Sequence, residues 1–300
     1  MHWIIGIQNA LDFIEENLTE DITVEEIAKR CYASTFHFQR VFGILCGYTV
    51  GEYMRNRRLS RAGAELNEGN QKVIDVALKY GYSSPDSFAK AFVAFHGITP
   101  SAARIPGAQL RSFSRLNIKL YLEGGSNMNY RIETKQKTRL LGYKRRFEGI
   151  PGNDEEQEVQ MWLNTRANQY LLQGVAKDPT LHYTVTIPAS DGGYDFYIAT
   201  ELREEDWAKL KEDSFLGEAD ATRFEEIPIQ AQTYAVFETE KEEFPTRNSL
   251  TMHKKIISEW LPSSEYVLAN APEIQKIHWH RKPNKKNRFI ELWIPIEKKK

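Results

Sequence analysis

Two helix–turn–helix patterns occur in the first third of the chain, about fifty residues apart. The matching positions are a helix-starting serine, an apolar phenylalanine and a helix-ending glycine: Ser34 and Ser84, Phe38 and Phe88, and Gly47 and Gly97. Serine is a preferred N-cap residue, and glycine is preferred just beyond a helix. Short turns occur in any helical bundle, but two tandem copies joined by one helix are far more specific. The repeat therefore predicts an all-α tandem helix-turn-helix domain.

Apolar residues at helical spacing place the helices of this domain. They are Thr23–Arg30 and a helix from Ser34 in the first unit, Val50–Leu66 as the connecting helix, and Val73–Tyr80 and a helix opened by Ser84 and Pro85 in the second unit. Thr23 and Glu26 have the spacing of a capping box. Gly81 supplies the left-handed backbone that a tight turn often needs.

The positive charge of the chain is concentrated in the middle of the sequence. Residues 28–119 carry 14 Lys and Arg against 5 acidic residues, a net charge of +9. Residues 1–27 carry seven acids and no Lys or Arg, and residues 128–300 carry 26 basic against 28 acidic residues. A basic segment in an otherwise neutral chain is the electrostatic footprint of a DNA-binding face, although a solvated surface is the alternative.

The N-terminus and the two cysteines indicate a soluble protein of the cytoplasm. Residues 1–6 lack the basic start and long apolar stretch of a secretory signal, and no apolar run is long enough for a membrane span. Cys31 and Cys46 lie in apolar helical patterns without metal spacing, so we expect reduced packing residues.

The segments TVEEIAKRCYASTFHFQRVFGILCGYTVGEYMRNRRLSRA and VIDVALKYGYSSPDSFAKAFVAFHGITPSAAR resemble the AraC/XylS DNA-binding domain. The resemblance covers about residues 4–104, and its strongest part is ALKYGYSSPDSFAKAFVAFHGITP. Ala103 and Arg104 replace the frequent Tyr-Arg ending of the family. The resemblance implies a DNA-binding transcription regulator, with an expected DNA-binding domain over residues 1–107.

A helix in the major groove presents its N-terminal and solvent-facing side chains to base edges. The expected residues are Thr35, Phe36, Gln39 and Arg40 in the first unit, and Pro85, Asp86, Ser87 and Lys90 in the second. Arg40 can bond a guanine edge through two hydrogen bonds, and Gln39 can read adenine. Four arginines of the connecting helix are expected to contact phosphates: Arg55, Arg57, Arg58 and Arg61. The alternative is that these are ordinary exposed polar residues.

Beyond an expected linker over residues 108–127, the period of the sequence changes toward two. The predicted order is Tyr130–Gln136, Arg139–Glu148, a helix over Asp154–Leu172, His182–Ala189 and Tyr194–Thr200, followed by Thr222–Ile227, Gln232–Glu238, a helix over Arg247–Trp260, Glu273–His280 and Arg288–Pro295. Strand, helix and paired strands occur twice, which predicts one internally duplicated α+β domain over residues 128–300.

The segments ISEWLPSSEYVLANAPEIQ and RFIELWIPI resemble the GyrI-like effector-binding domain, the Rob/BmrR type. The resemblance implies a ligand groove between the two repeats, centred on a glutamate that matches Glu291 and lined by aromatic residues. The expected wall residues are Tyr143, Trp162, Phe196, Tyr234, Trp260 and Trp293. A small hydrophobic cation would gain from both the carboxylate and the ring faces. Core packing of the tryptophans and a salt bridge of Glu291 on an edge strand are the alternatives.

Together these features predict a sequence-specific activator that binds double-stranded DNA, a small-molecule effector and RNA polymerase. No cofactor or membrane is expected, and His278 and His280 lack a third metal ligand. An enzyme is not expected, because the sequence has no nucleophile–base pair, phosphate loop or paired carboxylate motif. The alternatives are a GyrI-like small-molecule hydrolase that uses a glutamate and a tyrosine, and a module that sequesters drugs.

Overall fold

A computed structural model describes residues 2–31, 33–69, 71–117, 128–149, 151, 155–189, 193–212, 224–280 and 283–299. The chain divides into two compact units, residues 1–123 and 124–300, which are treated separately below. Part of the expected linker, residues 118–127, and the predicted element starts at Asp154 and Thr222 lie outside the described residues.

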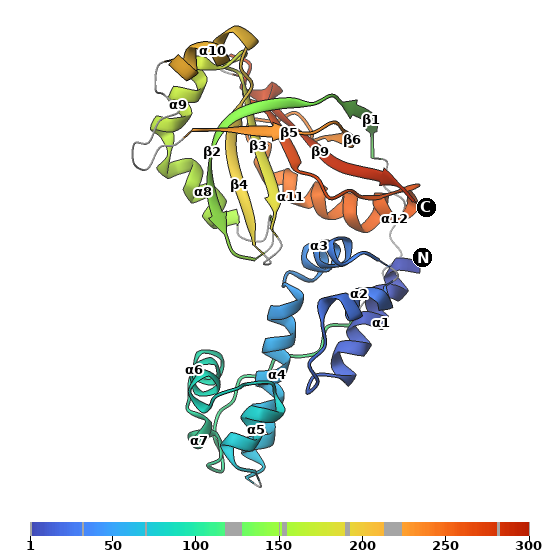
Figure 1. The fold of residues 1–300 in the computed structure, drawn as a ribbon, viewed down its shortest axis with the longest axis vertical. Helices are drawn as coiled ribbons and strands as arrows, with labels where there is room; N and C mark the ends of the chain where they lie inside the picture. The colour runs from blue at the N-terminus through green and yellow to red at the C-terminus, as the bar shows by residue number, and fades with distance from the viewer. Residues whose placement is uncertain are drawn as a thin grey trace. The chain divides into compact units, whose positions relative to one another are not determined.

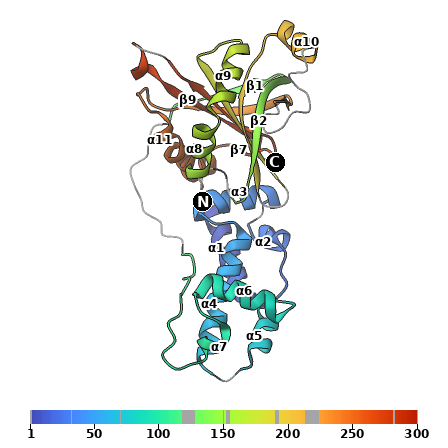
Figure 2. The ribbon, with the colours of Figure 1, turned by 90° about the vertical axis from the view of Figure 1, so that its left-hand side faces the viewer.

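The first unit consists of helices arranged along one longer helix, α4 (Figure 1). The helices are α1 (His2–Glu16), α2 (Val24–Arg30), α3 (Thr35–Cys46), α4 (Val50–Asn67), α5 (Val73–Lys79), α6 (Pro85–His96) and α7 (Pro100–Ala103). One helix–turn–helix, α2 and α3, precedes α4, and the other, α5 and α6, follows it. Figure 2 shows the same order after a quarter turn.

Local side chains start and end these helices as the sequence predicted. The Thr23 side chain accepts a hydrogen bond from the Glu26 backbone, and the Glu26 carboxylate accepts one in return from the Thr23 backbone. Ser34 and Ser84 cap α3 and α6 through their side-chain oxygens. Gly47 ends α3 at a φ of 76°, a left-handed conformation that favours glycine.

The two helix–turn–helix units have matching cores, which confirms the predicted repeat. Phe38 and Phe42 pack with ring centroids 5.5 Å apart at an interplanar angle of 52°. Phe88 and Phe92 repeat this pair at 5.4 Å and 54°. The small residues Ala28 and Ala77, at equivalent positions of α2 and α5, are each 1% exposed.

The second unit contains one antiparallel sheet in the strand order β1-β6-β9-β8-β3-β4-β2-β5, with β7 paired to β9. The strands are β1 (Tyr130–Lys135), β2 (Thr138–Phe147), β3 (Leu181–Pro188), β4 (Tyr194–Thr200), β5 (Glu225–Ile229), β6 (Gln232–Glu238), β7 (Tyr266–Leu268), β8 (Glu273–His278) and β9 (Phe289–Lys298). The helices are α8 (Glu155–Asn164), α9 (Arg166–Val175), α10 (Glu204–Glu212), α11 (Thr246–Lys255), the π-helix η1 (Ile256–Trp260), α12 (Leu261–Ser263) and the 3₁₀ helix η2 (Lys285–Asn287).

The two repeats exchange their first strands. β1 precedes the first repeat's other strands in sequence but pairs with β6, in the second repeat. β5 begins the second repeat but pairs with β2, in the first. β8 and β3 join the two halves at the centre of the sheet. The duplicated α+β domain predicted from the sequence is therefore confirmed, with an interlocked pairing.

The helix predicted over 154–172 is two helices, α8 and α9, because the chain leaves helical geometry at Thr165. The Thr165 hydroxyl donates to the Met161 carbonyl oxygen at 2.6 Å and accepts from the Tyr143 hydroxyl at 2.6 Å. A side chain that bonds the backbone and a neighbouring strand competes with regular helix hydrogen bonding.

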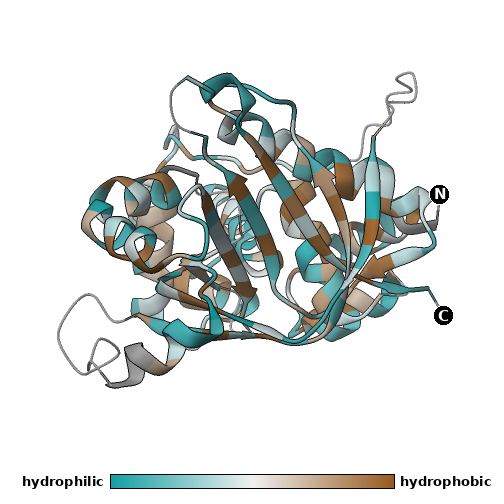
Figure 3. Cartoon of the chain, turned by 90° about the horizontal axis from the view of Figure 1, so that it is seen from above, coloured by the Kyte–Doolittle hydropathy of each residue, from teal (hydrophilic) through white to brown (hydrophobic). Residues whose placement is uncertain are grey.

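Alternating side chains give the sheet two different faces. One face, which we call the helix-covered face, carries Tyr143, Phe196 and Ile198 against Met161 of α8 and Leu172 of α9. The opposite face has a core cluster made of strand residues alone, which includes Tyr183, Tyr197, Tyr234 and Trp293. Figure 3 shows apolar and polar segments alternating along the strands. Among the described residues, no helix is long and apolar enough to span a membrane.

Candidate DNA-reading surface and effector site

The second helix–turn–helix presents its predicted residues to solvent. Ser84 caps α6 and Pro85 occupies its first turn, where the missing amide hydrogen costs nothing. Phe88 and Phe92 face the core at 0% exposure, so the other side of α6 is outward. The predicted residues Pro85, Asp86, Ser87 and Lys90 are all exposed. These four side chains therefore lie on the solvent-facing side of α6.

The first helix–turn–helix departs from the prediction at one residue. Gln39 is exposed, and Thr35 and Phe36 are half-buried. The expectation that Arg40 is exposed is wrong: it is 8% exposed, and burial lowers its pKa to about 10.

The arginines expected to contact phosphates have different surroundings. Arg55 and Arg61 are exposed on α4. Arg58 is half-buried, and its guanidinium donates to the carbonyl oxygens of Leu18 and Glu20, each at 2.7 Å. Arg58 therefore satisfies backbone carbonyl oxygens that follow the end of α1. The expectation of a phosphate contact is not supported for Arg58.

Sequence reasoning missed an ion pair inside the first unit, and this pair occupies Arg57, which was expected to contact phosphate. The Arg57 guanidinium donates to both carboxylate oxygens of Glu15 at 2.7 Å, and the Tyr53 hydroxyl donates to one of them at 2.7 Å. Burial alone would raise the pKa of Glu15, but the hydrogen bonds from Arg57 and Tyr53 outweigh it and lower the pKa. The available signal was the absence of Lys and Arg beside the seven acids of the first 27 residues, together with the four arginines of the connecting helix.

Three of the predicted effector residues lie together on the face opposite the helices. The Trp293 indole NH donates to the Glu291 carboxylate at 2.8 Å, and the Trp293 and Tyr234 rings pack edge-on at 5.8 Å. All three side chains are buried, Glu291 at 7% exposure. β9 lies between β6 and β8, so Glu291 is on an interior strand and not on an edge strand.

Basic side chains surround the Glu291 carboxylate. Arg131 of β1 approaches it at 3.2 Å and His278 of β8 at 3.4 Å. Burial alone would raise the pKa of Glu291, but the close approach of His278, the hydrogen bond from Trp293 and the charges of Lys276 and Arg131 outweigh it and lower the pKa to about 2. Glu291 is therefore ionised and already compensated within the protein.

Two further polar groups lie near Trp293 on this face. The Lys135 ammonium lies 5.2 Å from the centre of the indole, and burial lowers its pKa. The Tyr234 hydroxyl is buried and has no hydrogen-bond partner among the described residues. A buried hydroxyl without a partner is uncommon in proteins, and a bound ligand is one way to satisfy it.

The other four predicted aromatic residues lie elsewhere. Tyr143, Phe196 and the half-buried Trp162 belong to the cluster under α8 and α9 on the helix-covered face. Trp260, in the π-helix, packs against Tyr130 at 5.0 Å and Phe237 at 5.1 Å. The expectation of one aromatic-lined groove is wrong for these four, because strand alternation and the helices place them on the other face of the sheet.

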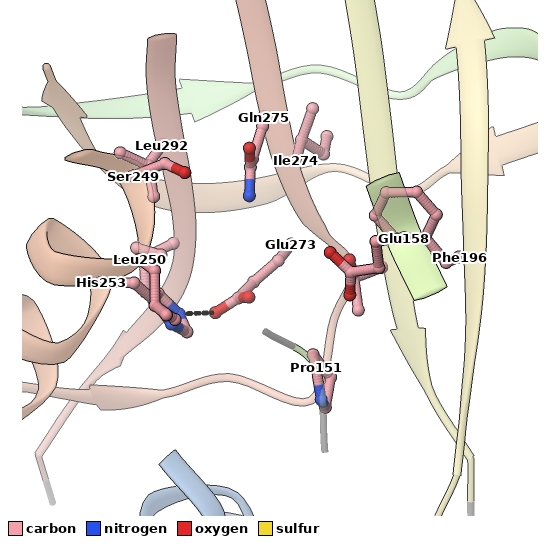
Figure 4. A pocket seen from close by; sticks show the side chains of 12 residues that line it. Pro151, Glu158, Phe196, Ser249, Leu250, His253, Glu273, Ile274, Gln275 and Leu292 are labelled. Carbon is pink, nitrogen blue, oxygen red and sulfur yellow. Dashed lines mark hydrogen bonds and ion pairs between the residues drawn. The ribbon is translucent and has the colours of Figure 1, made fainter. Parts of the chain in front are cut away.

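A small pocket lies on the helix-covered face between α8, α11 and the sheet (Figure 4). Its cavity volume is about 60 Å³, and its lining includes Phe196, Glu158, Ser249 and Gln275. The His253 ring nitrogen and the Glu273 carboxylate pair across it at 3.0 Å. A cavity of this size holds several water molecules. Among the described residues no group of three His, Cys, Asp or Glu is placed to hold a metal ion.

Both units resemble known proteins. A solved integron cassette protein of Vibrio cholerae aligns with 56% of this chain and 95% of that protein, at 11% identity and a TM-score of 0.35. The HTH-type transcriptional activator AarP of Providencia stuartii is 44% identical over 99 residues, which cover 33% of this chain and 73% of AarP. The multiple antibiotic resistance protein MarA of Salmonella typhimurium is 31% identical over 101 residues, 34% of this chain and 80% of MarA.

Two family models match the chain. The model of a helix-turn-helix domain matches residues 27–105, and the model of the integron-associated effector binding protein matches residues 131–296, more than half of the chain. The chain therefore belongs to the AraC family of helix-turn-helix transcription regulators through its first unit and to the GyrI-like, integron-associated effector-binding proteins through its second.

Proposed function

We propose that the chain is a sequence-specific transcription activator whose output is controlled by a small lipophilic cation bound at Glu291, Trp293 and Tyr234. One observation carries the effector proposal. The Arg131 guanidinium lies over the Trp293 ring at 5.8 Å and pairs with Glu291 at 3.2 Å. A cation held between a carboxylate and an indole face is the arrangement that recognises organic cations. Arg131 supplies such a cation from within the chain.

An effector takes the place of Arg131 in this proposal. The Arg131 side chain is 38% exposed and also pairs with Glu238 at 2.6 Å and with Glu133. It therefore keeps two acidic partners when a stronger cation occupies Glu291. An effector with aromatic rings also covers Trp293, and one with a polar group also satisfies the buried hydroxyl of Tyr234. These features support a cationic effector over a neutral one.

A fluorescence titration of the full chain tests the site, with tetraphenylphosphonium as the lipophilic cation. We expect saturable binding to the wild type, and at least about tenfold weaker binding to Glu291→Gln. Glu297→Gln, an exposed carboxylate on the same strand, is the matched control and should bind as the wild type does. Arg131→Gln should bind more tightly, because it removes the competing cation. Equal affinity of the wild type and Glu291→Gln places the effector elsewhere.

The DNA-binding half of the proposal rests on exposed residues. Lys90, Asp86 and Ser87 on α6, Gln39 on α3 and Arg55 on α4 are the solvent-facing residues proposed to contact DNA. Activation is supported by the relation to AarP, which is a transcriptional activator. We propose RNA polymerase as the partner in this activation. A reporter assay tests it: the wild type should raise transcription from a promoter that carries its selected site, and Lys90→Ala should lower that output.

A further inference from the structure

The segment that follows α7 is bound closely to the DNA-binding unit. We call residues 110–116 the strap. Its backbone amides donate to three side chains: Arg111 N to His96 Nδ1 at 3.2 Å, Phe113 N to Ser60 Oγ at 3.0 Å, and Leu116 N to the Tyr53 hydroxyl at 3.3 Å. Its trace passes back across α4 toward α1 (Figure 1). A flexible linker would leave these amides to water.

One end of the strap packs on the second helix–turn–helix. Leu110 joins the cluster around Phe88 and Phe92. The buried His96 ring at the end of α6 donates from Nε2 to the Leu59 carbonyl oxygen at 2.9 Å, so its Nδ1 is free to accept from the strap. Gly63 of α4 makes room for this ring, because a Cβ there would lie 2.5 Å from it. The strap thereby ties α6 to α4.

The other end of the strap packs on α1, on α4 and on Tyr48 in the turn between α3 and α4. The Phe113 ring lies edge-on to Tyr48 at 5.2 Å and to Tyr53 at 6.0 Å. The Phe113 carbonyl oxygen accepts from Arg57, whose guanidinium holds Glu15 of α1. Arg115 pairs with Asp12, also on α1. These contacts tie the strap to α1 and to the start of α4.

We infer that the strap is a positioning element that fixes the offset between the recognition helices α3 and α6. Both helix–turn–helix units pack on α4, and a single helix between them can bend or twist. The strap runs beside α4 and holds the second unit through Leu110 and His96. It reaches the first unit through Tyr48, which follows the end of α3, and through α1, which packs on α2. A change in their offset must therefore break contacts at one end of the strap. The inference rests on the DNA-binding function, because the offset decides whether both helices reach successive major grooves.

The offset can be measured without DNA. Labels on Gln39→Cys of α3 and Ala94→Cys of α6, both exposed positions, report the distance distribution between the helices. Burial raises the pKa of the native thiols of Cys31 and Cys46 to about 12, so they react poorly with the label. We expect one narrow distribution in the full-length chain and a broadened one in Phe113→Ala. The matched control is Ser114→Ala, at an exposed strap position, which should stay narrow.

A second measurement uses duplexes selected from a random pool by the full-length wild type. The wild type should prefer them over duplexes with one base pair inserted between the two contacted segments by roughly tenfold, the scale of one disrupted base contact. Phe113→Ala should lose this preference and keep its affinity for random DNA. Ser60→Ala, which removes the acceptor of the Phe113 amide, should lose part of this preference. It replaces Phe113→Ala in the experiment if that variant unfolds. The inference is overturned if both variants keep a narrow distance distribution and an intact preference for the selected duplexes. If the wild type selects no duplex, the proposed function is contradicted. The distance measurement then decides alone whether the strap fixes the offset.

Discussion

Replacing Glu291 by glutamine removes a buried carboxylate that Arg131, Lys276 and His278 face. A pKa held at about 2 in place of 4.5 corresponds to ~3 kcal/mol of interaction that favours the charged form in the folded state. Arg131 is 38% exposed and keeps Glu133 and Glu238 as partners, so part of this interaction is recovered in the variant. We therefore expect Glu291→Gln to destabilise the second unit by about 1–3 kcal/mol at neutral pH.

The same reasoning gives the dependence on pH. The folded pKa lies below the unfolded value, so the stabilisation is fully present above pH 4.5 and is lost as the pH falls from 4.5 toward about 2. Urea unfolding followed by tryptophan fluorescence reports the second unit, which contains five of the six tryptophans. The difference between wild type and Glu291→Gln should shrink as the solution is acidified through this range.

Glu297→Gln is the control for this experiment, because its carboxylate is exposed on the same strand. It should change the free energy of unfolding by less than about 0.5 kcal/mol. If Glu291→Gln is as stable as the wild type at neutral pH, or if the difference between them persists below the pKa of Glu291, the ion pairs around this carboxylate do not stabilise the fold.

Three further predictions concern the sheet, the DNA and the strap. Gly142→Ala should destabilise the second unit by about 1–3 kcal/mol in urea unfolding, because its Cβ would lie 2.7 Å from the Ile198 carbonyl oxygen. Gly174→Ala is the control, because a Cβ there meets nothing within 4 Å, and it should be as stable as the wild type. An equal loss of stability in both variants would show that the loss does not come from this close contact. Lys90→Ala should weaken binding to all duplexes and reduce the slope of log affinity against log salt by about one, and an unchanged slope would mean that Lys90 does not contact phosphate. Burial lowers the pKa of His96 below 6.5, so the first unit should lose stability as the pH falls below 6.5 in thermal unfolding followed by circular dichroism. The same pH dependence in His96→Gln would assign that loss to another group.

The helices and strands were predictable because their signals are local. Thr23 with Glu26, Ser34 and Ser84 mark helix starts through hydrogen bonds within a few residues, and the structure has these caps. The strand over Gln232–Glu238 was predicted with its observed bounds, since alternation with period two is visible in the sequence itself. The duplicated order of strands and helices follows from the same local patterns.

The candidate sites were only partly predictable. Glu291, Trp293 and Tyr234 lie together as expected, because a glutamate in an apolar strand is conspicuous in a sequence. Arg131 lies far from Glu291 along the chain and reaches it only because β1 is placed in the second half of the sheet, beside β6. The sequence composition predicted that the strap is part of a linker. Its contacts were not visible in the sequence, because the side chains that accept its amide hydrogens lie 15 to 63 residues away along the chain.

The sequence by itself determined most of the helices and strands, which residues share a face of each of them, and that two helix–turn–helix units precede a duplicated α+β domain; it merged α8 with α9 and missed α10 and β7. The tertiary structure decided which strands pair across the repeats, which of the predicted aromatic residues meet at Glu291, and which arginines are committed to partners within the protein. The physical reason is distance along the chain. Caps and periodicity arise between neighbours in sequence, whereas the exchange of β1 and β5, the ion pair of Arg57 with Glu15 and the surroundings of Glu291 join residues that only packing brings together.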